Sequence, residues 1–316
     1  MPRFRHALTR AWFGTLWPRR GGRRARRADA AVTLAGLLIL SAGTAALAAA
    51  APSVAAPHSA VTRWWHPPAR PTFYWQLQGT LPLHEPALID DVDGFDTSAA
   101  EVARLHAAGH RVICYIDVGT WERWRPDARD FPRAVLGHPN GWPGERWLDI
   151  RNLRVLEPIM RRRLEMCAQK GFDGVEPDNI NPIGNDPGFP ITPRDVIRYA
   201  RWVAGTAHSL GLAVLQKNGS QFTAALEPSF DGALTEQCNQ YSECAAYEPY
   251  LRVGKPVIDA EYQSRLFPRF CTTDARLGIV GALYNLALNG RRYRPCPPLT
   301  GPTATVPTAV ARARMA

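Results

Sequence analysis

The sequence lacks the short motifs that most often indicate a metal ion or a nucleotide. It has no CxxC pair, and the spacing of its eight histidines does not indicate a metal, so no metal site is predicted. Neither G-x-G-x-x-G after the first predicted strand nor G-x-x-x-x-G-K-[ST] occurs. Their absence removes the two commonest reasons to expect an open, doubly wound sheet.

Net positive charge is small once the first 50 residues are set aside. The chain has a formal net charge of +10, but residues 1–50 carry nine arginines and a single acid, Asp29. That segment supplies +8, and everything after it supplies only about +2. The remaining chain has no basic excess of the kind that binds nucleic acid, so no nucleic-acid partner is expected.

The first 50 residues have the features of an export signal. A basic region ending at Arg27 precedes an apolar run from Ala30 to Ala50, and small residues suit cleavage near Ala49 or Ala50. We predict a signal peptide over 1–50 and a secreted protein without stable membrane association after cleavage. The alternative is an uncleaved membrane anchor, since roughly 20 apolar residues can cross a bilayer.

Composition divides the rest of the chain into three parts. Residues 51–71 are rich in Pro and Ala, which suits a spacer. Over 297–316 Pro, Thr and Ala return without apolar periodicity, which predicts a disordered tail. Residues 72–296 are long enough for one domain with a sizeable core. We expect a single-domain monomer.

Within 72–296, short apolar runs alternate with longer amphipathic segments, the pattern of βα units and a parallel sheet. Eight strands are predicted, which is the number in a (β/α)₈ TIM barrel of the α/β class. The predicted strands are Phe73–Leu77, Ala87–Val92, Val112–Val118, Gly174–Glu176, Ala213–Lys217, Gly232–Thr235, Pro256–Ala260 and Leu277–Val280. The predicted helices are Ser98–Ala108, Val155–Lys170, Pro193–Leu210, Gln221–Leu226, Ala245–Val253 and Ser264–Arg269.

All six cysteines follow the predicted signal, an even number compatible with disulfides in an oxidising compartment. The predicted pairs are Cys238 with Cys244, within one loop, and Cys271 with Cys296, near the end of the domain. Cys114 and Cys167 fall in a predicted strand and a predicted helix, where they could pair or remain buried thiols.

The active site of such a barrel is built at the carboxyl ends of its strands. In this sequence nearly every predicted strand ends in an acid, an amide or an aromatic residue. These strand-end residues include Trp75, Gln76, Asp93, Tyr115, Asp117, Glu176, Asp178, Asn179, Lys217, Glu236, Glu261 and Tyr262. Aromatic faces stack on sugar rings, polar groups bind hydroxyls, and two carboxylates can cleave a glycosidic bond. The strand ends therefore favour a carbohydrate-cleaving enzyme.

The alternation of side chains along a strand predicts which of these residues face the barrel interior and how deep they lie. Glu176 and Asp178 lie on the same side one layer apart, with Glu176 deeper in the barrel, and Cys114 turns towards the helices. Two roles stay open for several strand-end residues. Asp117, Glu176 and Lys217 could contact substrate or form a buried ion-pair network. Trp75, Tyr115 and Tyr262 could stack on sugar or fill the upper layer of the barrel.

Seven sequence blocks between Thr72 and Tyr262 carry a resemblance to a known family. They are FYWQLQG at Phe73–Gly79, DVDGFDT at Asp91–Thr97, VICYIDVGTWERWRPD at Val112–Asp127, RWLDIRN at Arg146–Asn152, KGFDGVEPDNIN at Lys170–Asn181, TEQCNQYSEC at Thr235–Cys244 and GKPVIDAEY at Gly254–Tyr262. Their order and spacing resemble the endo-α-1,4-polygalactosaminidases of glycoside hydrolase family 114. The resemblance implies a (β/α)₈ fold, no metal or organic cofactor, and hydrolysis of polymers of α-1,4-linked galactosamine or N-acetylgalactosamine.

The resemblance also implies that Asp178 and Glu236 are the catalytic pair. The other strand-end residues named above are then expected to bind the polysaccharide. We assign Asp178 as nucleophile and Glu236 as acid/base in a retaining scheme, with inversion as the alternative. Two further alternatives are a polysaccharide-binding barrel without catalysis and a hydrolase of another exopolysaccharide or a cell-wall glycan.

Two expectations concern charge. A rim of acids would attract a cationic, partly deacetylated polymer; its members would be Asp90, Asp91, Asp93, Asp117, Glu176 and Glu261. The run Arg161–Arg163 is expected to form a solvated helix face.

Overall fold

A computed structural model describes residues 63–82 and 87–297 of the protein. The predicted signal peptide, the start of the predicted spacer and the tail after Pro297 lie outside these residues. Trp64, within the predicted spacer, stacks on His208 with ring centroids 3.8 Å apart, and its indole Nε1 donates to Asp231. Packing against the barrel therefore begins before residue 72.

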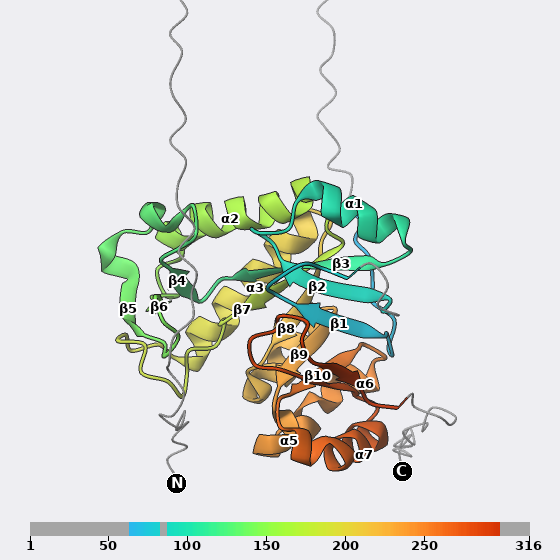
Figure 1. The fold of residues 1–316 in the computed structure, drawn as a ribbon. Helices are drawn as coiled ribbons and strands as arrows, with labels where there is room; N and C mark the ends of the chain where they lie inside the picture. Colours follow the sequence, from blue (N-terminus) through green and yellow to red (C-terminus); the bar gives the residue numbers. More distant parts are fainter. Residues whose placement is uncertain (1–62, 83–86, 298–316) are drawn as a thin grey trace, which may run out of the picture. The chain divides into compact units, whose positions relative to one another are not determined.

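Eight parallel strands lie side by side in the order in which they follow along the chain (Figure 1). They are β1 (Phe73–Gln76), β2 (Ile89–Asp93), β3 (Arg111–Asp117), β7 (Gly174–Asp178), β8 (Ala213–Lys217), β9 (Gly232–Glu236), β10 (Val257–Glu261) and β11 (Val280–Tyr284). A ninth strand, β12 (Tyr293–Pro295), pairs with β11 in the antiparallel direction.

Individual contacts link β1 to the last part of the sheet. The hydroxyls of Tyr284 and Tyr293 donate to the carbonyl oxygen of Phe73, at 3.3 and 2.9 Å. The backbone N–H groups of Leu77 and Gln78 donate to the carbonyl oxygen of Leu288. The strands therefore form a nearly closed parallel barrel, which confirms the predicted TIM-barrel class.

The long helices pack on the outside of the strands. They are α1 (Ala99–Ala107), α2 (Leu153–Lys170), α3 (Pro193–Ser209) and α7 (Phe267–Leu277). Shorter helices are α4 (Thr223–Leu226), α5 (Cys238–Tyr241) and α6 (Glu248–Arg252), with 3₁₀ turns η1 (Ala128–Asp130), η2 (Arg133–Val135), η3 (Ser220–Phe222), η4 (Glu227–Ser229), η5 (Cys244–Tyr247) and η6 (Ser264–Leu266). None of the described helices is both long enough and apolar enough to span a bilayer.

Local sequence explains where the long helices begin and end. Ser98 with Glu101, and Thr192 with Asp195, form capping boxes at the starts of α1 and α3, which satisfy backbone N–H groups that have no partner within the helix. Gly171 ends α2 in the left-handed conformation, with φ of 87°.

A small antiparallel sheet interrupts the βα alternation after β3. Its strands are β4 (Thr120–Glu122), β5 (Leu136–Pro139) and β6 (Glu145–Leu148), in the order β4-β6-β5. The sequence analysis did not predict this sheet, because three or four residues per strand give too little periodicity to recognise. It stands beside the barrel in Figure 1, where β3 leads into it.

The predicted eighth strand, Leu277–Val280, is wrong: it begins three residues and ends four residues before the observed one. Leu277 is the last residue of α7, Gly278 ends that helix in the left-handed conformation with φ of 85°, and the strand runs over Val280–Tyr284. The apolar run from Leu277 onward is shared between the buried end of a helix and the start of a strand. Periodicity alone does not separate those two uses of a short apolar run.

The expected solvated face at Arg161–Arg163 is also wrong for its last member. Arg161 and Arg162 are exposed, but Arg163 is 2% exposed. Its guanidinium donates to Asp127 at 2.8 and 3.0 Å and to the carbonyl oxygen of Asp117 at 2.6 Å. A buried Arg is tolerated because its donors are matched by a carboxylate and a carbonyl, so α2 is tied directly to the end of β3.

Three disulfides connect all six cysteines. They are Cys114–Cys167, Cys238–Cys244 and Cys271–Cys296. The two predicted pairs are confirmed, and the question left open for Cys114 and Cys167 is settled in favour of pairing. The first disulfide joins the outer side of β3 to α2, and such bonds indicate an oxidising, extracytoplasmic compartment.

Candidate active site

The ammonium group of Lys217 lies at the centre of the barrel mouth. Its Nζ is 2.6 Å from Glu176 Oε1, 3.2 Å from Asp178 Oδ1 and 3.4 Å from Glu236 Oε2. Three carboxylates thus surround one ammonium group, which donates hydrogen bonds to Glu176 and Asp178 and forms an ion pair with Glu236. Burial opposes the charged form of Lys217, but the three carboxylates outweigh it and hold its pKa well above the ordinary value.

Asp178, at the end of β7, has donors on both oxygens. Besides Lys217, the backbone N–H of Asn179 donates to Oδ1 at 2.8 Å, and the hydroxyl of Tyr115 donates to Oδ2 at 3.0 Å. Burial, then the nearby Asp178 carboxylate, raises the pKa of Tyr115 well above its ordinary value. Tyr115 therefore remains a hydrogen-bond donor to Asp178 at all ordinary pH values.

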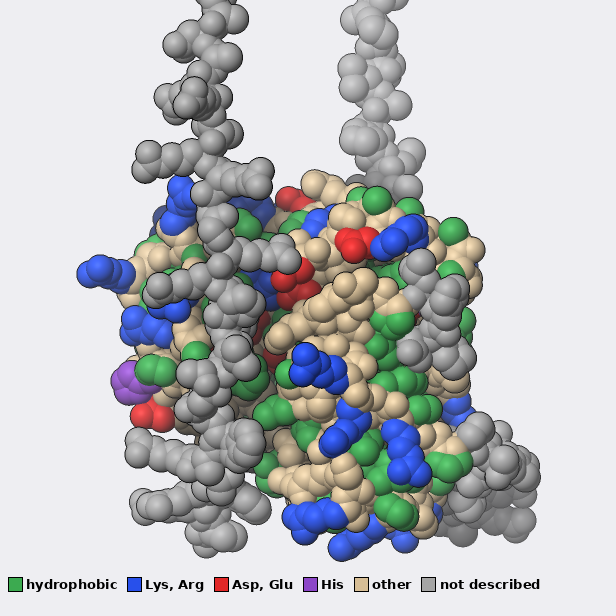
Figure 2. Space-filling view, in the orientation of Figure 1, with side chains coloured by type: hydrophobic (Ala, Val, Ile, Leu, Met, Phe, Trp, Pro, Cys, Tyr) green, Lys and Arg blue, Asp and Glu red, His purple; other side chains and the backbone are tan. Residues whose placement is uncertain are grey.

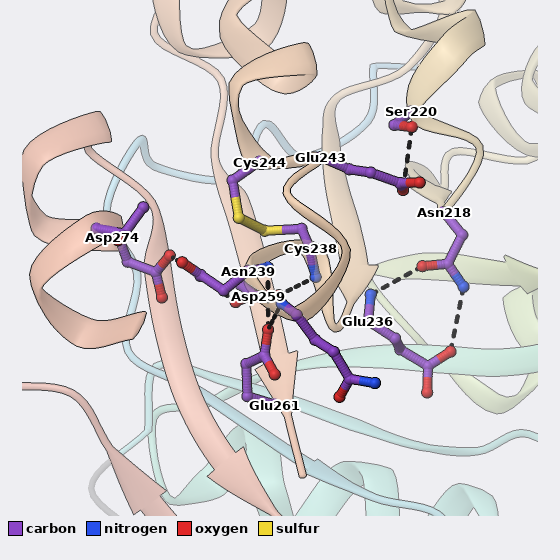
Figure 3. The surroundings of a disulfide bond; sticks show 12 residues. Asn218, Ser220, Glu236, Cys238, Asn239, Glu243, Cys244, Asp259, Glu261 and Asp274 are labelled. Atoms are coloured by element: carbon purple, nitrogen blue, oxygen red, sulfur yellow. Dashed lines mark hydrogen bonds between the residues drawn. A yellow bond between two sulfur atoms is a disulfide. The ribbon is translucent and has the colours of Figure 1, made fainter. Parts of the chain in front are cut away.

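Glu236, at the end of β9, is held by Tyr262 and Asn218. The Tyr262 hydroxyl donates to Oε1, and Asn218 Nδ2 donates to Oε2 at 3.1 Å. Asn218 also accepts the backbone N–H of Glu236 at 2.8 Å, so it fixes both ends of this residue, as the paired dashed lines in Figure 3 show. Glu236 is the more open of the two acids, with 27% of its side chain exposed against 18% for Asp178.

Three neighbouring strands are each followed by a residue in the left-handed backbone conformation. Asn179, Asn218 and Gln237 follow β7, β8 and β9 directly, with φ of 58°, 49° and 60°. Such values are uncommon outside glycine, are best tolerated by Asn, and cluster at functional sites. They turn the chain sharply away from the mouth after Asp178, Lys217 and Glu236.

Asp117 supports this arrangement from a buried position. Its carboxylate accepts the backbone N–H groups of Gly119 and Thr120, the Thr120 hydroxyl at 2.5 Å and Asn179 Nδ2 at 2.6 Å. Burial, then the charge of Asp178, raises the pKa of Asp117 well above its ordinary value. Of the two roles left open for Asp117, these contacts favour structural support of the Asn179 turn.

Trp75 forms part of the floor beneath the ammonium group. Its ring centroid is 4.6 Å from Lys217 Nζ, and the side chain is only 2% exposed. A cation over the indole face is favourable, but so little exposure leaves no ring face for a sugar. Trp75 therefore belongs to the filled layer of the barrel.

Three predicted substrate contacts are engaged elsewhere. Gln76 donates to the carbonyl oxygens of Gln78 and Thr80. Both oxygens of Asp93 are held by Arg125, at 2.9 and 2.7 Å. Glu261 accepts backbone N–H groups at the start of α5. The side chains of Gln76, Asp93 and Glu261 are all buried, so we reassign them from substrate binding to holding the loops around the mouth.

The expected acidic rim is wrong because its members are buried. None of Asp90, Asp91, Asp93, Asp117, Glu176 and Glu261 is more than 6% exposed. Asp90 turns outward and contacts His110 at 2.5 Å. Figure 2 shows acidic side chains recessed near the middle of the viewed face, between the part that carries β4 to β6 and the barrel. The negative charge of the site lies inside the mouth instead of around it.

Sequence reasoning missed one feature of the site and one of the inserted sheet region beside the barrel. Asn218 follows Lys217 directly and was visible at the end of a predicted strand, but its hold on Glu236 needs the neighbouring strand. The second feature is the pair Trp124 and Trp142 in the inserted sheet region, 43% and 45% exposed. The signal for them was tryptophan density, because the chain's ten tryptophans include four in the 31 residues from 118 to 148.

A second group of acids lies on the outer side of β10. Asn239 Nδ2 donates to Asp259 Oδ2 at 3.0 Å and to Asp274 Oδ1 at 2.7 Å, beside the Cys238–Cys244 disulfide (Figure 3). These sulfur atoms and carboxylates are close enough together to resemble metal ligands. The sulfurs are bonded to each other, however, and an amide donor already binds both acids, so the group serves to fix α5 against α7.

Asp274→Asn is expected to flatten part of the pH dependence of stability. Burial raises the pKa of Asp274 from 3.8 to about 7, and Glu261 adds to this. Because the folded state binds that proton more tightly than the unfolded state, the free energy of unfolding decreases as pH rises from about 4 to about 7. Urea unfolding across this range measures the effect. Asp186→Asn, at an 87% exposed carboxylate, is the control; an unchanged decline in Asp274→Asn would contradict the prediction.

Comparison with known proteins identifies the family. The sequence profile of glycoside hydrolase family GH114 matches residues 54–296. The chain belongs to glycoside hydrolase family 114. Comparison with curated proteins gave no match. As a member of this family the protein is a glycoside hydrolase, and the alternative of a barrel without catalysis is set aside.

Two solved structures that differ in their sequence identity to this chain support the fold. The crystal structure of Aspergillus fumigatus Ega3 in complex with galactosamine is 31% identical, with a TM-score of 0.69, over 72% of this chain and 96% of that one. The glycoside hydrolase domain of PelA from Pseudomonas aeruginosa is 13% identical, with a TM-score of 0.55, over 71% of this chain and 97% of that one. The family 114 protein therefore shares its barrel with hydrolase domains of both fungal and bacterial origin.

Proposed function

We propose that the protein cleaves polymers of α-1,4-linked galactosamine or N-acetylgalactosamine within the chain, with Asp178 and Glu236 as its catalytic carboxylates. The observation that carries this proposal is the contact of both carboxylates with one buried ammonium group, Lys217 Nζ. The 31% identity to Ega3, whose crystal structure contains galactosamine, supports an amino sugar as the substrate.

The spacing of the two carboxylates supports a retaining mechanism. Because Lys217 Nζ lies 3.2 Å from Asp178 Oδ1 and 3.4 Å from Glu236 Oε2, these oxygens are no more than about 6.6 Å apart. This upper limit lies at the short end of the separation that inverting enzymes need. Retaining enzymes hold the carboxyl groups about 5 to 5.5 Å apart, whereas inverting enzymes need roughly 6.5 to 9.5 Å.

The two acids then divide the reaction between them. Asp178 is oriented by the Tyr115 hydroxyl and by Lys217, and attacks the anomeric carbon to form a glycosyl ester. Glu236, the more exposed acid, gives its proton to the departing glycosidic oxygen and later takes a proton from the attacking water. Proton NMR of the first products tests the scheme, since a retaining enzyme releases the α-anomer first.

The decisive test of the function is release of new reducing ends. The purified protein is incubated with fully acetylated and partly deacetylated galactosamine polymers, with chitin and dextran as matched polymers of other linkages. Cleavage of the galactosamine polymers alone supports the proposal. Cleavage of another glycan in their place would show a hydrolase of different specificity, which is the remaining alternative from the sequence.

Charge distribution favours the Lys217 region over a pocket between α5 and α7 as the place where the polymer binds. A pocket of about 510 Å³ between α5 and α7 is lined by Arg265, Arg269 and Arg276. Basic side chains gather over this part of the viewed face in Figure 2. A cationic, partly deacetylated polymer would be repelled there and attracted by the recessed carboxylates.

Trp124→Ala and Trp142→Ala are expected to raise KM for the polymer about 3- to 10-fold each, with kcat nearly unchanged, because an exposed ring that stacks on a distant sugar contributes roughly 1 kcal/mol of binding. Steady-state kinetics on polymer measures both constants. Leu88→Ala removes a 40% exposed apolar side chain just before β2, at the opposite end of the barrel, and should leave KM unchanged. Unchanged KM in both Trp variants would place the polymer elsewhere.

We also propose that the protein acts outside the cell as a monomer after cleavage of its N-terminal signal. The three disulfides support the compartment. N-terminal sequencing of the mature protein tests the cleavage. A mature chain that retains residues 1–50 would support the membrane-anchored alternative instead.

A further inference from the structure

Two buried carboxyl groups meet beneath the catalytic pair. The carboxyl group of Asp91 on β2 faces that of Glu176 on β7, whose charge acts on it more strongly than that of any other group, and both side chains are fully buried. Among the described residues, no donor reaches either oxygen of Asp91 or Oε2 of Glu176. Two ionised carboxylates so placed would repel each other where water cannot screen them. A proton held between the two groups would remove this repulsion.

Strand geometry places Asp91 in this position. In the sheet register its Cα is paired with those of Trp75 on β1 and Ile113 on β3, whose side chains belong to the inner core of the barrel. The next residue back, Asp90, turns outward to His110. Asp91 therefore points into the barrel, one layer below the mouth, and has no route to the substrate.

The charged groups that face Asp91 come from two other strands. Lys217 on β8 and Glu176 and Asp178 on β7 act on its carboxyl group, and Tyr284 on β11 is the other titratable neighbour. Burial, then Glu176, raises the pKa of Asp91 well above its ordinary value. Burial raises the pKa of Glu176 to about 7, against the opposing effect of Lys217.

We propose that Asp91 and Glu176 share one proton, with the Asp91 hydroxyl donating to Glu176 Oε2, and that Asp91 is a positioning residue for Lys217. The shared proton leaves the pair with a single negative charge. Glu176 Oε2 is then occupied, so Oε1 faces Lys217 Nζ at 2.6 Å. A pair without a proton would separate by repulsion, and a pair with two protons would leave Lys217 without the negative charge at its shortest contact.

Asp91 acts on the reaction only through this chain of contacts. Lys217 in turn reaches Asp178 and Glu236, at 3.2 and 3.4 Å, so a shift of its ammonium group would move both catalytic carboxylates. The kinetic part of this inference rests on the proposed function. The shared proton itself does not depend on which polymer is cleaved.

The variants Asp91→Asn and Asp91→Leu separate the effect of the hydrogen bond donated by residue 91 from the effect of the volume of its side chain. The Asn amide donates an N–H to Glu176 Oε2, whereas Leu fills similar space and donates nothing. We expect Asp91→Asn to keep kcat within about threefold of wild type and Asp91→Leu to lower it about 100-fold, the loss typical of a reacting group displaced by about 1 Å. KM should change little in both, because Asp91 does not touch substrate.

These kinetics can also overturn the proposal. A large loss in both variants would mean that Asp91 acts as an ionised group, and full activity of Asp91→Leu would mean that it positions nothing. Circular dichroism first establishes that each variant is folded. Should Asp91→Leu fail to fold, Asp91→Asn and the spectroscopic measurement below decide the question.

Infrared difference spectroscopy gives a readout independent of hydrolysis. The spectrum of wild type minus Asp91→Asn near pH 7 should contain the C=O band of a protonated carboxylic acid, shifted in heavy water. Asp186→Asn, at an exposed carboxylate, should leave that band in place. A difference spectrum without the band would refute the shared proton even if the polymer assays succeed, and the band's presence would support it even if they fail.

Discussion

Asp178→Asn is expected to reduce kcat on galactosamine polymer by about 10⁴-fold or more, and Glu236→Gln by about 10²- to 10⁴-fold. An amide at position 178 cannot form the glycosyl ester, and an amide at position 236 cannot deliver a proton. Each change replaces one oxygen by nitrogen, so the shape of the side chain is kept. New reducing ends per enzyme per minute, measured at saturating polymer, give the ratio directly.

The leaving group of the substrate separates the two roles. An aryl galactosaminide with an acidic phenol needs no protonation to depart, so Glu236→Gln should recover much of its first-step rate on it, and Asp178→Asn should not. If the first-step rate recovered in Asp178→Asn instead, Asp178 would be the acid/base and Glu236 the nucleophile. Asp186→Asn and Glu248→Gln make the same substitutions at exposed acids and should match wild type. Activity that survives in both site variants would refute the catalytic pair.

The position of the candidate site was predictable from the sequence because parallel strands all present their carboxyl ends at one rim. Glu176 and Asp178 lie one layer apart, as alternation along β7 requires, with Glu176 buried and Asp178 partly open. The residues Tyr115, Lys217, Glu236 and Tyr262 also converge on the mouth. The alternation along the strands and the positions of their ends were enough to predict this part of the site.

The sequence could not show which side a residue takes where a strand leaves the sheet. Glu261 and Tyr262 are neighbours, yet Glu261 faces α5 and Tyr262 faces Glu236. A difference of one residue reverses the face, and strand ends are the least certain boundaries in a sequence. Gln76 was misassigned for the same reason.

The other differences between the predicted and the observed site come from ion pairs between segments that are distant in the sequence. Asp93 is neutralised by Arg125 and Arg163 by Asp127, across 32 and 36 residues of chain. Each of these side chains looks like an ordinary surface charge until the inserted sheet region folds back on the barrel. A sequence shows that the charges exist but not that they pair, and pairing decides whether they are free to bind substrate.

Lys217→Met is expected to impair both stability and catalysis. Met replaces the length of the side chain but removes the charge, which leaves Glu176 buried without its cation. Breaking a buried ion pair in this way costs about 3–5 kcal/mol. We also expect kcat to fall about 10²- to 10³-fold, because Asp178 and Glu236 lose the group that holds them at their spacing. Urea unfolding and steady-state kinetics measure the two effects separately.

The pH dependence of the stability lost in Lys217→Met identifies the cause of that loss. Lys217 lowers the pKa of Glu176 against the effect of burial, so without it Glu176 binds its proton more tightly in the folded state. Stability of the variant should then fall more steeply than that of wild type as pH rises above about 4.5, the ordinary value of a Glu. Lys255→Met, at a 29% exposed lysine paired with the carboxylate of Glu227, should cost less than about 1 kcal/mol. If Lys217→Met retained wild-type kcat, the ammonium group would only stabilise the barrel, and the spacing of the catalytic pair would have to be set by Tyr115, Asn218 and Tyr262.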